Sequence, residues 1–590
     1  MLRNCCIAYK TFSRIASQTL RLQRTHLKSG ITIYRQPVSV ARQPVSAGLL
    51  TPTCRRIVGY SLASCFIARQ IFITHNALCL QVHQHGEKHF ESLKQTCDSG
   101  QYKLIQVFWS IYKYCRLFIR LVWACSLYGP LFTLYPITVY IPSWKQTWLK
   151  ALLFLVEISG PTFIKLGQWA STRRDLFSAD FCNTFAKLHM NAPSHSWHYT
   201  ARRLEEVFGK EWRDMFVIVE TIIHSGCIGQ VHKAYMRPDV IEKVKSQVNF
   251  GGQFRIPAEE IEGCSDTKAP LIPVAIKILH PGVYNTVHWD IQLLHTLARF
   301  CSLIPGVKWL SLTECVEEFE AMMKNQIDLV VEAENLDRFN KNFSNVSCVK
   351  FPRPIWPFVT HDILVETYEE GESIATIIQM PNGPDGLKER LAEIGINTLL
   401  KMVFVDNFVH ADLHPGNILV QGMSDYQPSS SIDEDDVGFE ATTVGRMTRK
   451  DCPLKLVLLD TGIVSHLNEG DRRNLQQVML AVTLGKGELA AELLVNHSKT
   501  SECHDIETFK AEFAVLVQQV HKLTLQLGQI QVGTLMQDVL NVFIKHKVKF
   551  ESNFASIVLA VMVLEGLSRS LDPHLDIFEA AKPILLGQSV

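Results

Sequence analysis

Acidic residues are missing from the first 86 positions of the chain, although the same stretch contains eleven Lys or Arg side chains and many Ser and Thr. A segment that is free of acid and rich in Arg and Ser is typical of a mitochondrial transit peptide. The alternative is a disordered basic tail. We predict that residues 1–90 are a transit peptide and linker, and that the protein is mitochondrial, at the inner membrane.

Cysteine pairs with the spacing of a metal site are also missing. The chain has 16 Cys but no Cys-x-x-Cys, which argues against a structural zinc site or a secreted disulfide framework. A net charge of +1 leaves no overall basic field to recruit nucleic acid, so no nucleic-acid partner is expected.

A Walker-type phosphate loop is absent as well, yet three separate segments indicate an ATP site. Residues 274–277 read Val-Ala-Ile-Lys, residues 410–417 read His-Ala-Asp-Leu-His-Pro-Gly-Asn, and residues 460–462 read Asp-Thr-Gly after an apolar run. Each segment alone has an ordinary structural explanation. Because all three occur in the order found in protein kinases, together they predict kinase-type phosphoryl transfer.

The kinase pattern gives each polar residue a role. Lys277 and Asp412 are the predicted catalytic residues, and Asn417 and Asp460 the predicted Mg²⁺ ligands. Lys277 also binds the ATP phosphates in this prediction, with Glu332 as its partner, since an unpaired ammonium would be poorly positioned.

Two further segments complete the predicted nucleotide site. The loop where a phosphate-binding turn should lie consists of Ser225, Gly226, Cys227, Ile228 and Gly229. The strand-like run at 363–368 is the predicted hinge, whose backbone groups between Glu366 and Tyr368 would bind adenine.

The order of the kinase motifs implies an α+β, bilobal, protein-kinase-like fold with a mostly helical large lobe, and the pattern of apolar residues predicts an N-terminal helical extension ahead of it. We place the extension at 148–210, the small lobe at 214–370 and the large lobe at 371–590. Helices are expected at 150–171, 178–191, 197–208, 285–303, 312–343, 388–408 and 469–484, and small-lobe strands near 216–223, 231–236 and 271–279. Two polar stretches, 237–270 and 424–453, are expected to be insertions.

An apolar segment at 104–145 raises the question of membrane contact. Its centre, Leu121–Ile141, has twenty-one residues without a charge, about the length that spans a bilayer. Gly129, Pro130 and Pro136 would interrupt a regular helix there. A transmembrane helix is the preferred interpretation, and a hydrophobic hairpin or in-plane segment docked on the kinase-like domain is the alternative.

Several motifs together resemble the aarF/UbiB family of atypical kinases over about residues 150–585. They are Lys-x-Gly-Gln at 165–168, the Ser-Gly-Cys loop, His-Ala-Asp-x-His-Pro-Gly-Asn, and the C-terminal Gly-Leu-Ser-Arg-Ser-Leu-Asp-Pro at 566–573. The resemblance implies that Lys165, Gly167 and Gln168 are regulatory, on a helix that covers the site. The sequence departs from the family at Gln326, where Glu is usual, and from kinases at Thr461, where Phe is usual.

The predicted function is that of an atypical kinase or ATPase that uses ATP and Mg²⁺. The catalytic loop has Ala411 where protein kinases have Arg, and no Ala-Pro-Glu segment follows Asp460, so a lipid-linked or small-molecule acceptor is favoured over a protein. The resemblance implies a role in ubiquinone (coenzyme Q) biosynthesis, with membrane lipid, a quinone-type molecule or a lipid-biosynthesis assembly as partner. The alternative is a pseudokinase that acts as a nucleotide-gated, lipid-binding scaffold.

Overall fold

The computed structural model describes residues 99–172, 177–189, 194–237, 240, 272–303, 312–380, 384, 386–426, 453–497 and 505–525, with short stretches between 538 and 575. The predicted transit peptide lies outside these residues. The same holds for nearly all of both predicted insertions and for part of the C-terminal motif.

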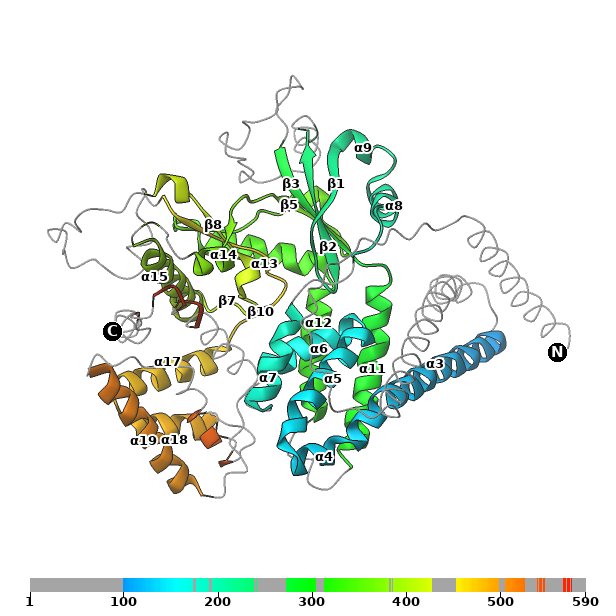
Figure 1. Ribbon diagram of the computed structural model, residues 1–590. Coiled ribbons are helices and arrows are strands. Elements are labelled where there is room, and N and C mark those ends of the chain that lie inside the picture. Colours follow the sequence, from blue (N-terminus) through cyan, green and yellow to red (C-terminus); the bar gives the residue numbers. More distant parts are fainter. Residues whose placement is uncertain are drawn as a thin grey trace, which may run out of the picture. The chain divides into compact units, whose positions relative to one another are not determined.

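A four-stranded antiparallel sheet forms the small lobe (Figure 1). Its order is β1 (Phe216–Ser225), β2 (Gly229–Met236), β3 (Ile272–Leu279) and β5 (Ile363–Thr367). Side chains alternate between the two faces of a strand, so Val274, Ile276 and Ile278 share one face and Ala275 and Lys277 the other. The first face is buried in an apolar cluster, which leaves the face of Lys277 for the site.

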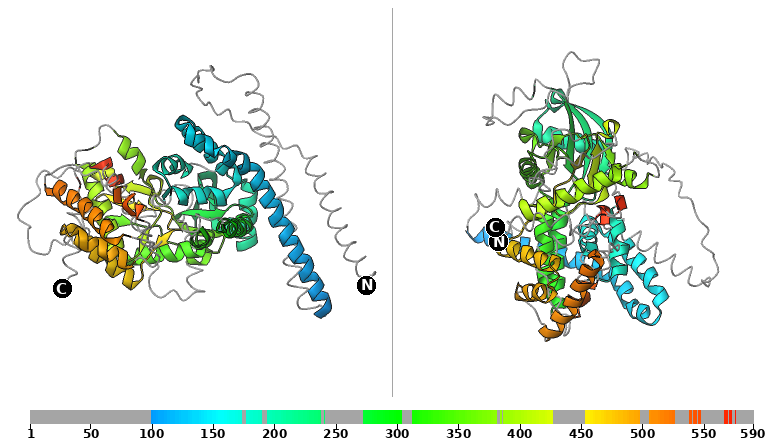
Figure 2. Two further views of the ribbon diagram at one scale, coloured as in Figure 1. Left: turned by 90° about the horizontal axis from the view of Figure 1, so that it is seen from below. Right: turned by 90° about the vertical axis from the view of Figure 1, so that its left-hand side faces the viewer.

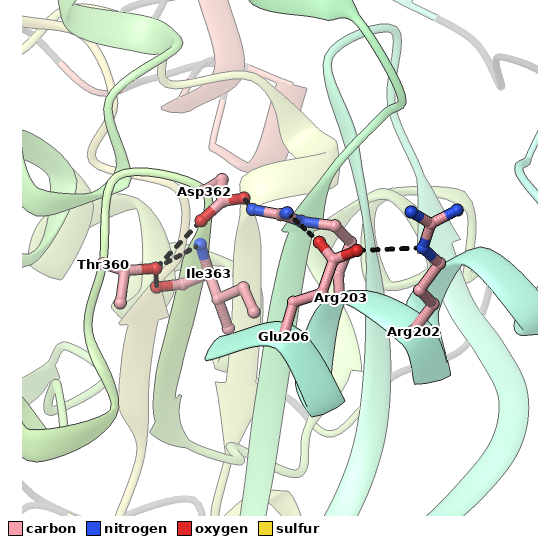
Figure 3. A network of polar contacts seen from close by, with 6 residues as sticks. All are labelled: Arg202, Arg203, Glu206, Thr360, Asp362 and Ile363. Atoms are coloured by element: carbon pink, nitrogen blue, oxygen red, sulfur yellow. Dashed lines mark hydrogen bonds and ion pairs between the residues drawn. The ribbon is translucent and has the colours of Figure 1, made fainter. Parts of the chain in front are cut away.

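The buried face of this sheet is covered by α8 (Trp197–Phe208) and α9 (Trp212–Met215), which contribute Leu204 and Trp212 to the cluster. Polar contacts fix α8 in place (Figure 3). Arg203 forms ion pairs with Glu206 of its own helix and with Asp362, just before β5. The helix predicted at 197–208 is therefore present, and it is part of the small-lobe structure.

The predicted helix at 150–171 is two helices, α5 (Lys145–Ser159) and α6 (Pro161–Thr172). Gly160 separates them with φ +106°, a conformation that favours glycine, and Pro161 begins the next helix. The helix predicted at 178–191 is shorter, with α7 (Ala179–Phe185) running into the 3₁₀ turn η2 (Ala186–His189).

The stretch at 312–343 is also two helices rather than the single predicted one. After α11 (Val283–Cys301) come α12 (Leu312–Gln326) and α13 (Leu329–Asn342). Asp328 adopts an extended conformation between them, and its side chain accepts a hydrogen bond from the N–H of Val330, so it caps α13. A new helix therefore starts after Asp328, and Glu332 lies in the first turn of α13.

In the large lobe, two short sheets hold the catalytic loop. One has the order β4 (Val349–Lys350), β9 (Lys455–Leu458), β8 (Ile418–Gln421), β6 (Glu372–Ser373), and the other pairs β7 (Val409–His410) with β10 (Val464–Ser465). Short 3₁₀ turns lie at η5 (Trp356–Phe358), η7 (Pro415–Asn417) and η8 (Met423–Asp425).

The large-lobe helices are α14 (Ile374–Gln379), α15 (Leu387–Leu400) with a π-helical turn η6 (Lys401–Val405), α17 (Glu469–Thr483), α18 (Gly487–His497) and α19 (Ile506–Leu525). Figure 2 shows α17, α18 and α19 lying together, and they share an apolar cluster centred on Phe509 and Phe513. The large lobe is mostly helical, as predicted.

The apolar segment forms α3 (Ser99–Thr133), followed by α4 (Tyr135–Tyr140) and the 3₁₀ turn η1 (Pro142–Trp144). By length and composition, the stretch Tyr114–Thr133 is able to cross a membrane, and most of that stretch is not buried. The interruption expected at Gly129 and Pro130 does not occur, because α3 continues through both residues and ends at Thr133, before Pro136.

One face of α3 is docked on the domain, with two arginines among the apolar side chains that pack there. Arg120 Nε lies 2.7 Å from Asp290 Oδ1 on α11, and these side chains are only 8% and 1% exposed. The Arg120 guanidinium also donates to the carbonyl of Ser159, and Arg116 lies over the ring of Trp289. These contacts are those of the alternative interpretation, an apolar segment docked on the kinase-like domain.

Candidate nucleotide site

Three charged side chains from distant parts of the sequence meet on the open face of the small-lobe sheet. Lys277 Nζ on β3 lies 2.7 and 2.8 Å from the two carboxylate oxygens of Glu332 on α13. It lies 3.1 Å from Oδ1 of Asp460, which follows β9. Glu332 is 4% exposed and Asp460 47%, so one carboxylate is enclosed and the other is open to solvent.

The charges of Lys277 and Asp460 stabilise each other, whereas burial raises the pKa of Glu332 to about 7 despite its pairing with Lys277. Desolvation disfavours the charged form of Lys277, but Asp460 and Glu332 outweigh it and raise the pKa of the Lys277 ammonium. Desolvation likewise opposes ionisation of Asp460, but Lys277 and Lys165 outweigh it and lower the pKa of this carboxyl. Near neutral pH the site therefore holds a protonated amine beside an ionised carboxylate, as a metal–phosphate complex requires.

The catalytic loop is organised by His410, whose role the sequence analysis missed. Its Nε2 lies 3.0 Å from the carbonyl of Leu459, so Nε2 carries the proton, and its Nδ1 accepts from the N–H of Asp412 at 3.2 Å. Burial lowers the pKa of His410 and keeps the ring neutral. The ring thus links the Asp412 backbone to the strand that leads to Asp460.

Asn417 is tied to the same loop. The side-chain amide nitrogen of Asn417 donates to the backbone carbonyl of Asp412 at 3.1 Å. The backbone carbonyl of Asn417 accepts a hydrogen bond from the N–H of Leu459. The first contact uses the nitrogen of the side-chain amide, which leaves the oxygen as the group suited to a metal ion. Asp412, Asn417 and Asp460 are therefore held within one hydrogen-bonded unit.

Thr461 stands where protein kinases have Phe, and it fixes the Asp460 turn by hydrogen bonds that the sequence did not predict. It is fully buried, its hydroxyl donates to the carbonyl of Glu332 at 3.2 Å, and its carbonyl accepts from the Asn335 side chain at 2.9 Å. The turn that carries Asp460 is thus fixed to α13 by hydrogen bonds instead of aromatic packing. Asp460 itself adopts φ +54°, which Asp tolerates better than most residues.

The loop Ser225–Gly229 closes the hairpin between β1 and β2. Its turn is tight, with the N–H of Gly226 donating to the carbonyl of Gly229 at 2.9 Å. A Cβ at Gly229 would lie 2.7 Å from the Ile278 carbonyl oxygen, so this position requires glycine. The Ser225 hydroxyl is buried and has no hydrogen-bond partner among the described residues, which fits a ligand group such as phosphate.

The hinge differs in one respect from the prediction. Glu366 pairs with Ala275 across the sheet, so its side chain lies on the same face as Lys277, and burial raises its pKa to about 8. The N–H of Tyr368 donates to the carbonyl of Pro273 at 3.2 Å, so this donor is already used within the sheet. The side chain of Glu366, and not only hinge backbone, thus belongs to the candidate site.

The Lys-x-Gly-Gln motif divides into one residue near the site and two that pack its helix. The electrostatic neighbours of Lys165 are Cys227, Asp412 and Asp460, and they raise its pKa against the opposing effect of desolvation. Gln168 donates to the carbonyl of Leu188 at 2.9 Å, and Gly167 is buried between α5, α7 and η2. The motif therefore presents the Lys165 charge to the site by packing α6 tightly on its neighbours.

Gly167 provides a direct test of this packing. A Cβ there would lie 2.5 Å from Leu188 Cδ1 and 3.1 Å from Phe185 Cδ1. We expect Gly167→Ala to lower the free energy of unfolding by about 1–3 kcal/mol, as overpacking does. The matched control is Gly129→Ala in α3, where a Cβ meets nothing within 4 Å and helix propensity predicts a gain of about 0.5–1 kcal/mol. Urea unfolding of both variants checks this, and equal stabilities would contradict it.

Gln326, where the family usually has Glu, has a side chain that is not fully satisfied by hydrogen bonds within the described residues. The Gln326 side-chain oxygen is buried without a hydrogen-bond partner in the described part of the chain, and Asp328, two residues later, caps α13 and contacts His361. Within the described residues, Lys165 likewise makes no ion pair. The neutral Gln326 therefore brings no negative charge, such as the resemblance implies for a Glu at this position, that could pair with Lys165.

The donor set fits magnesium with phosphate better than a metal held by protein alone. Among the described residues, no group of three or more His, Cys, Asp or Glu side chains is placed to hold a metal ion. Mg²⁺ bound to a nucleotide commonly takes only one or two protein ligands and completes its shell with phosphates and water. Asp460 and Asn417 meet that requirement.

A small-lobe sheet with a paired Lys277 and Glu332, joined to a helical lobe whose loop carries Asp412 and Asn417, defines a protein-kinase-like domain with a nucleotide site. The ABC1 atypical kinase-like domain matches residues 269–494, and the UbiB helical domain matches residues 516–576. The chain belongs to the ABC1/UbiB family of atypical kinases.

Three relatives illustrate the match. A mitochondrial ABC1 family protein of Saccharomyces cerevisiae is 31% identical over 85% of this chain and 80% of its own length. One of Schizosaccharomyces pombe, also mitochondrial, is 35% identical over 75% of this chain and 66% of its own. A probable serine/threonine-protein kinase of Dictyostelium discoideum is 33% identical over 76% of this chain, which spans 66% of that protein.

Proposed function

We propose that this chain is a mitochondrial phosphotransferase or ATPase that uses Mg-ATP and supports lipid metabolism such as ubiquinone biosynthesis. The observation that carries the proposal is the Lys277–Glu332 ion pair with Asp460 at 3.1 Å from the same ammonium. Lys277 would hold the α- and β-phosphates, Asn417 and Asp460 would hold Mg²⁺, and Asp412 would orient the acceptor. When bound, the metal ion would neutralise charge on the transferred phosphate.

The geometry after Asp460 supports an acceptor other than a protein. β10 begins at Val464 and pairs with β7, and the Ala411 N–H donates to the carbonyl of Ile463 at 3.0 Å. The chain thus returns to the catalytic loop within four residues, and α17 starts at Glu469. This leaves little chain for a segment that docks a peptide, so we propose a small-molecule or lipid-linked acceptor.

The proposal includes contact with the inner mitochondrial membrane through α3. Large apolar side chains on its outer side are exposed, namely Ile111, Tyr114, Phe118, Ile119, Val122 and Phe132. A helix that exposes an apolar face to solvent and docks its opposite face on the protein suits the membrane interface. The mitochondrial relatives support the location, and an import assay on the chain without residues 1–90 tests it.

The experiment that tests the proposal is ATP hydrolysis by the full chain, with and without liposomes that contain anionic lipid. Removing residues up to 144 would discard the buried Arg120–Asp290 contact, so α3 is kept. Turnover that depends on Mg²⁺ and rises with liposomes supports the proposal. Mg-ATP binding without turnover would favour the second candidate, a nucleotide-gated scaffold. The observation that favours this candidate is the Gln326 side-chain oxygen, which is buried and has no hydrogen-bond partner within the described residues.

Lys165 is expected to restrain this activity. Its ammonium lies in the field of Asp412 and Asp460, where it competes with the charges of Mg²⁺ and substrate. We expect Lys165→Ala to raise ATP turnover several-fold, measured as kcat at saturating ATP. Lys150→Ala, an exposed lysine on α5, is the control and should leave kcat unchanged. Unaltered turnover in Lys165→Ala would count against the regulatory role.

A further inference from the structure

Two histidines from separate parts of the chain meet beside the nucleotide loop. His195 lies just before α8 and His280 just after β3. Their Nδ1 atoms are 2.6 Å apart, and the two rings are perpendicular. The Nε2 atom of His280 lies 2.8 Å from the carbonyl oxygen of Gly226, inside the loop Ser225–Gly229. The segment before α8 is thus connected to the loop through one imidazole.

The partners fix which atoms carry protons. A carbonyl only accepts, so His280 Nε2 carries a proton, and in a neutral ring its Nδ1 is then an acceptor. His195 Nδ1 must therefore donate to His280, and His195 Nε2 accepts from the Thr200 hydroxyl at 3.0 Å. The result is a directed chain of hydrogen bonds from Thr200 to the Gly226 carbonyl.

Backbone contacts strengthen the same connection. The His280 N–H donates to the carbonyl of Ile228 at 2.8 Å, so side chain and backbone of one residue hold two loop carbonyls. The His195 N–H donates to the side-chain oxygen of Gln230 at 2.9 Å, directly after the loop. The Arg203–Asp362 ion pair fixes α8 to the start of β5 (Figure 3), and His195 lies two residues before this helix.

We propose that His280, supported by His195, is a positioning residue for the nucleotide loop. A peptide carbonyl that turned toward the phosphates would repel them, and the hydrogen bond from His280 holds the Gly226 carbonyl away from that orientation. The segment that precedes α8 thereby helps to set the shape of the loop. This inference rests on the proposed nucleotide site.

The test compares four variants of the full chain. His280→Ala removes the donor, and we expect it to weaken Mg-ATP binding about tenfold, the effect of losing one hydrogen bond and its loop geometry, with kcat at saturating ATP nearly unchanged. His280→Gln places an amide N–H near the former Nε2 and should restore most of the affinity. His195→Ala should give a smaller loss. His198→Ala, an exposed histidine on α8, is the matched control.

Hydrogen exchange without nucleotide separates this inference from the proposed function. Backbone amides at 225–230 should exchange faster in His280→Ala and His195→Ala than in wild type or His198→Ala. If wild type fails to bind Mg-ATP, the proposed function fails, and the exchange rates still decide whether the histidines order the loop. Wild-type affinity and wild-type exchange in His280→Ala would overturn the proposal, and so would failure of His280→Gln to recover.

Discussion

Replacing Asp460 with Asn is expected to abolish the Mg-ATP-dependent stabilisation of the protein and to reduce ATP turnover by about 100-fold or more, as loss of a preorganised charge at a reacting phosphate does. Asp460 lies 3.1 Å from Lys277, and its pKa is held low by that ammonium, so it supplies the site's accessible negative charge. The Asn side chain keeps the shape and removes the charge that Mg²⁺ requires.

Asp460→Asn should change metal binding and turnover without changing the stability of the nucleotide-free protein. Asn tolerates the left-handed conformation that Asp460 adopts at φ +54°, and the neighbouring Lys277 keeps its bidentate pair with Glu332. We therefore expect the nucleotide-free variant to unfold close to wild type. A variant that loses stability without ligand would show that Asp460 matters mainly to the fold.

The measurement is a thermal-shift series with Mg-ATP alongside the hydrolysis assay. At a ligand concentration a hundredfold above Kd, binding adds about 2.7 kcal/mol to wild type, which a melt detects. Asp214→Asn, an exposed carboxylate on α9, serves as the control and should keep the full shift. If Asp460→Asn binds Mg-ATP as well as wild type does, Asp460 is not the metal ligand.

The order of motifs along the chain was enough to predict the kinase-like fold, because a strand lysine, a catalytic loop and a following aspartate impose one bilobal arrangement. The ion pair between Lys277 and Glu332 is present, although 55 positions separate the two residues. What fixes that pair, however, was not evident from the sequence. Thr461 holds the Asp460 turn against α13 through the Glu332 carbonyl, a contact that depends on three-dimensional proximity alone.

Helix boundaries were predicted least well where one residue decides the direction of the chain. Apolar periodicity continues across Gly160 and across Asp328, so it predicted a single helix in each place. The left-handed φ of Gly160 and the capping side chain of Asp328 end that regularity locally. His280 was missed for a related reason, since a lone histidine after a strand carries no pattern, and its importance comes from Gly226 and His195 lying against it.

The second large expected effect is a loss of stability when the contact between α3 and α11 is broken. We expect Arg120→Ala to lower the free energy of unfolding by about 3–5 kcal/mol, because it leaves the carboxylate of Asp290 buried and without its cation. The guanidinium also donates to the Ser159 carbonyl and lies over the Trp123 ring, so packing is lost together with charge. The control is Lys145→Ala, whose pair with Asp180 is 46% and 49% exposed and should be worth less than about 1 kcal/mol.

Urea unfolding of the full chain measures both variants, and Asp290→Asn combined with Arg120→Ala gives a decisive comparison. Arg120→Ala alone leaves the Asp290 carboxylate buried without its cation, whereas the double variant has no charge at either position. The loss of stability in the double variant should therefore be smaller than the sum of the losses in the two single variants. Equal effects of Arg120→Ala and Lys145→Ala would mean that α3 does not rest on α11. A helix free of the domain would then be available to span the bilayer, whereas a strong coupling keeps the Arg120 face of α3 on the protein and leaves only its exposed apolar face available to lipid.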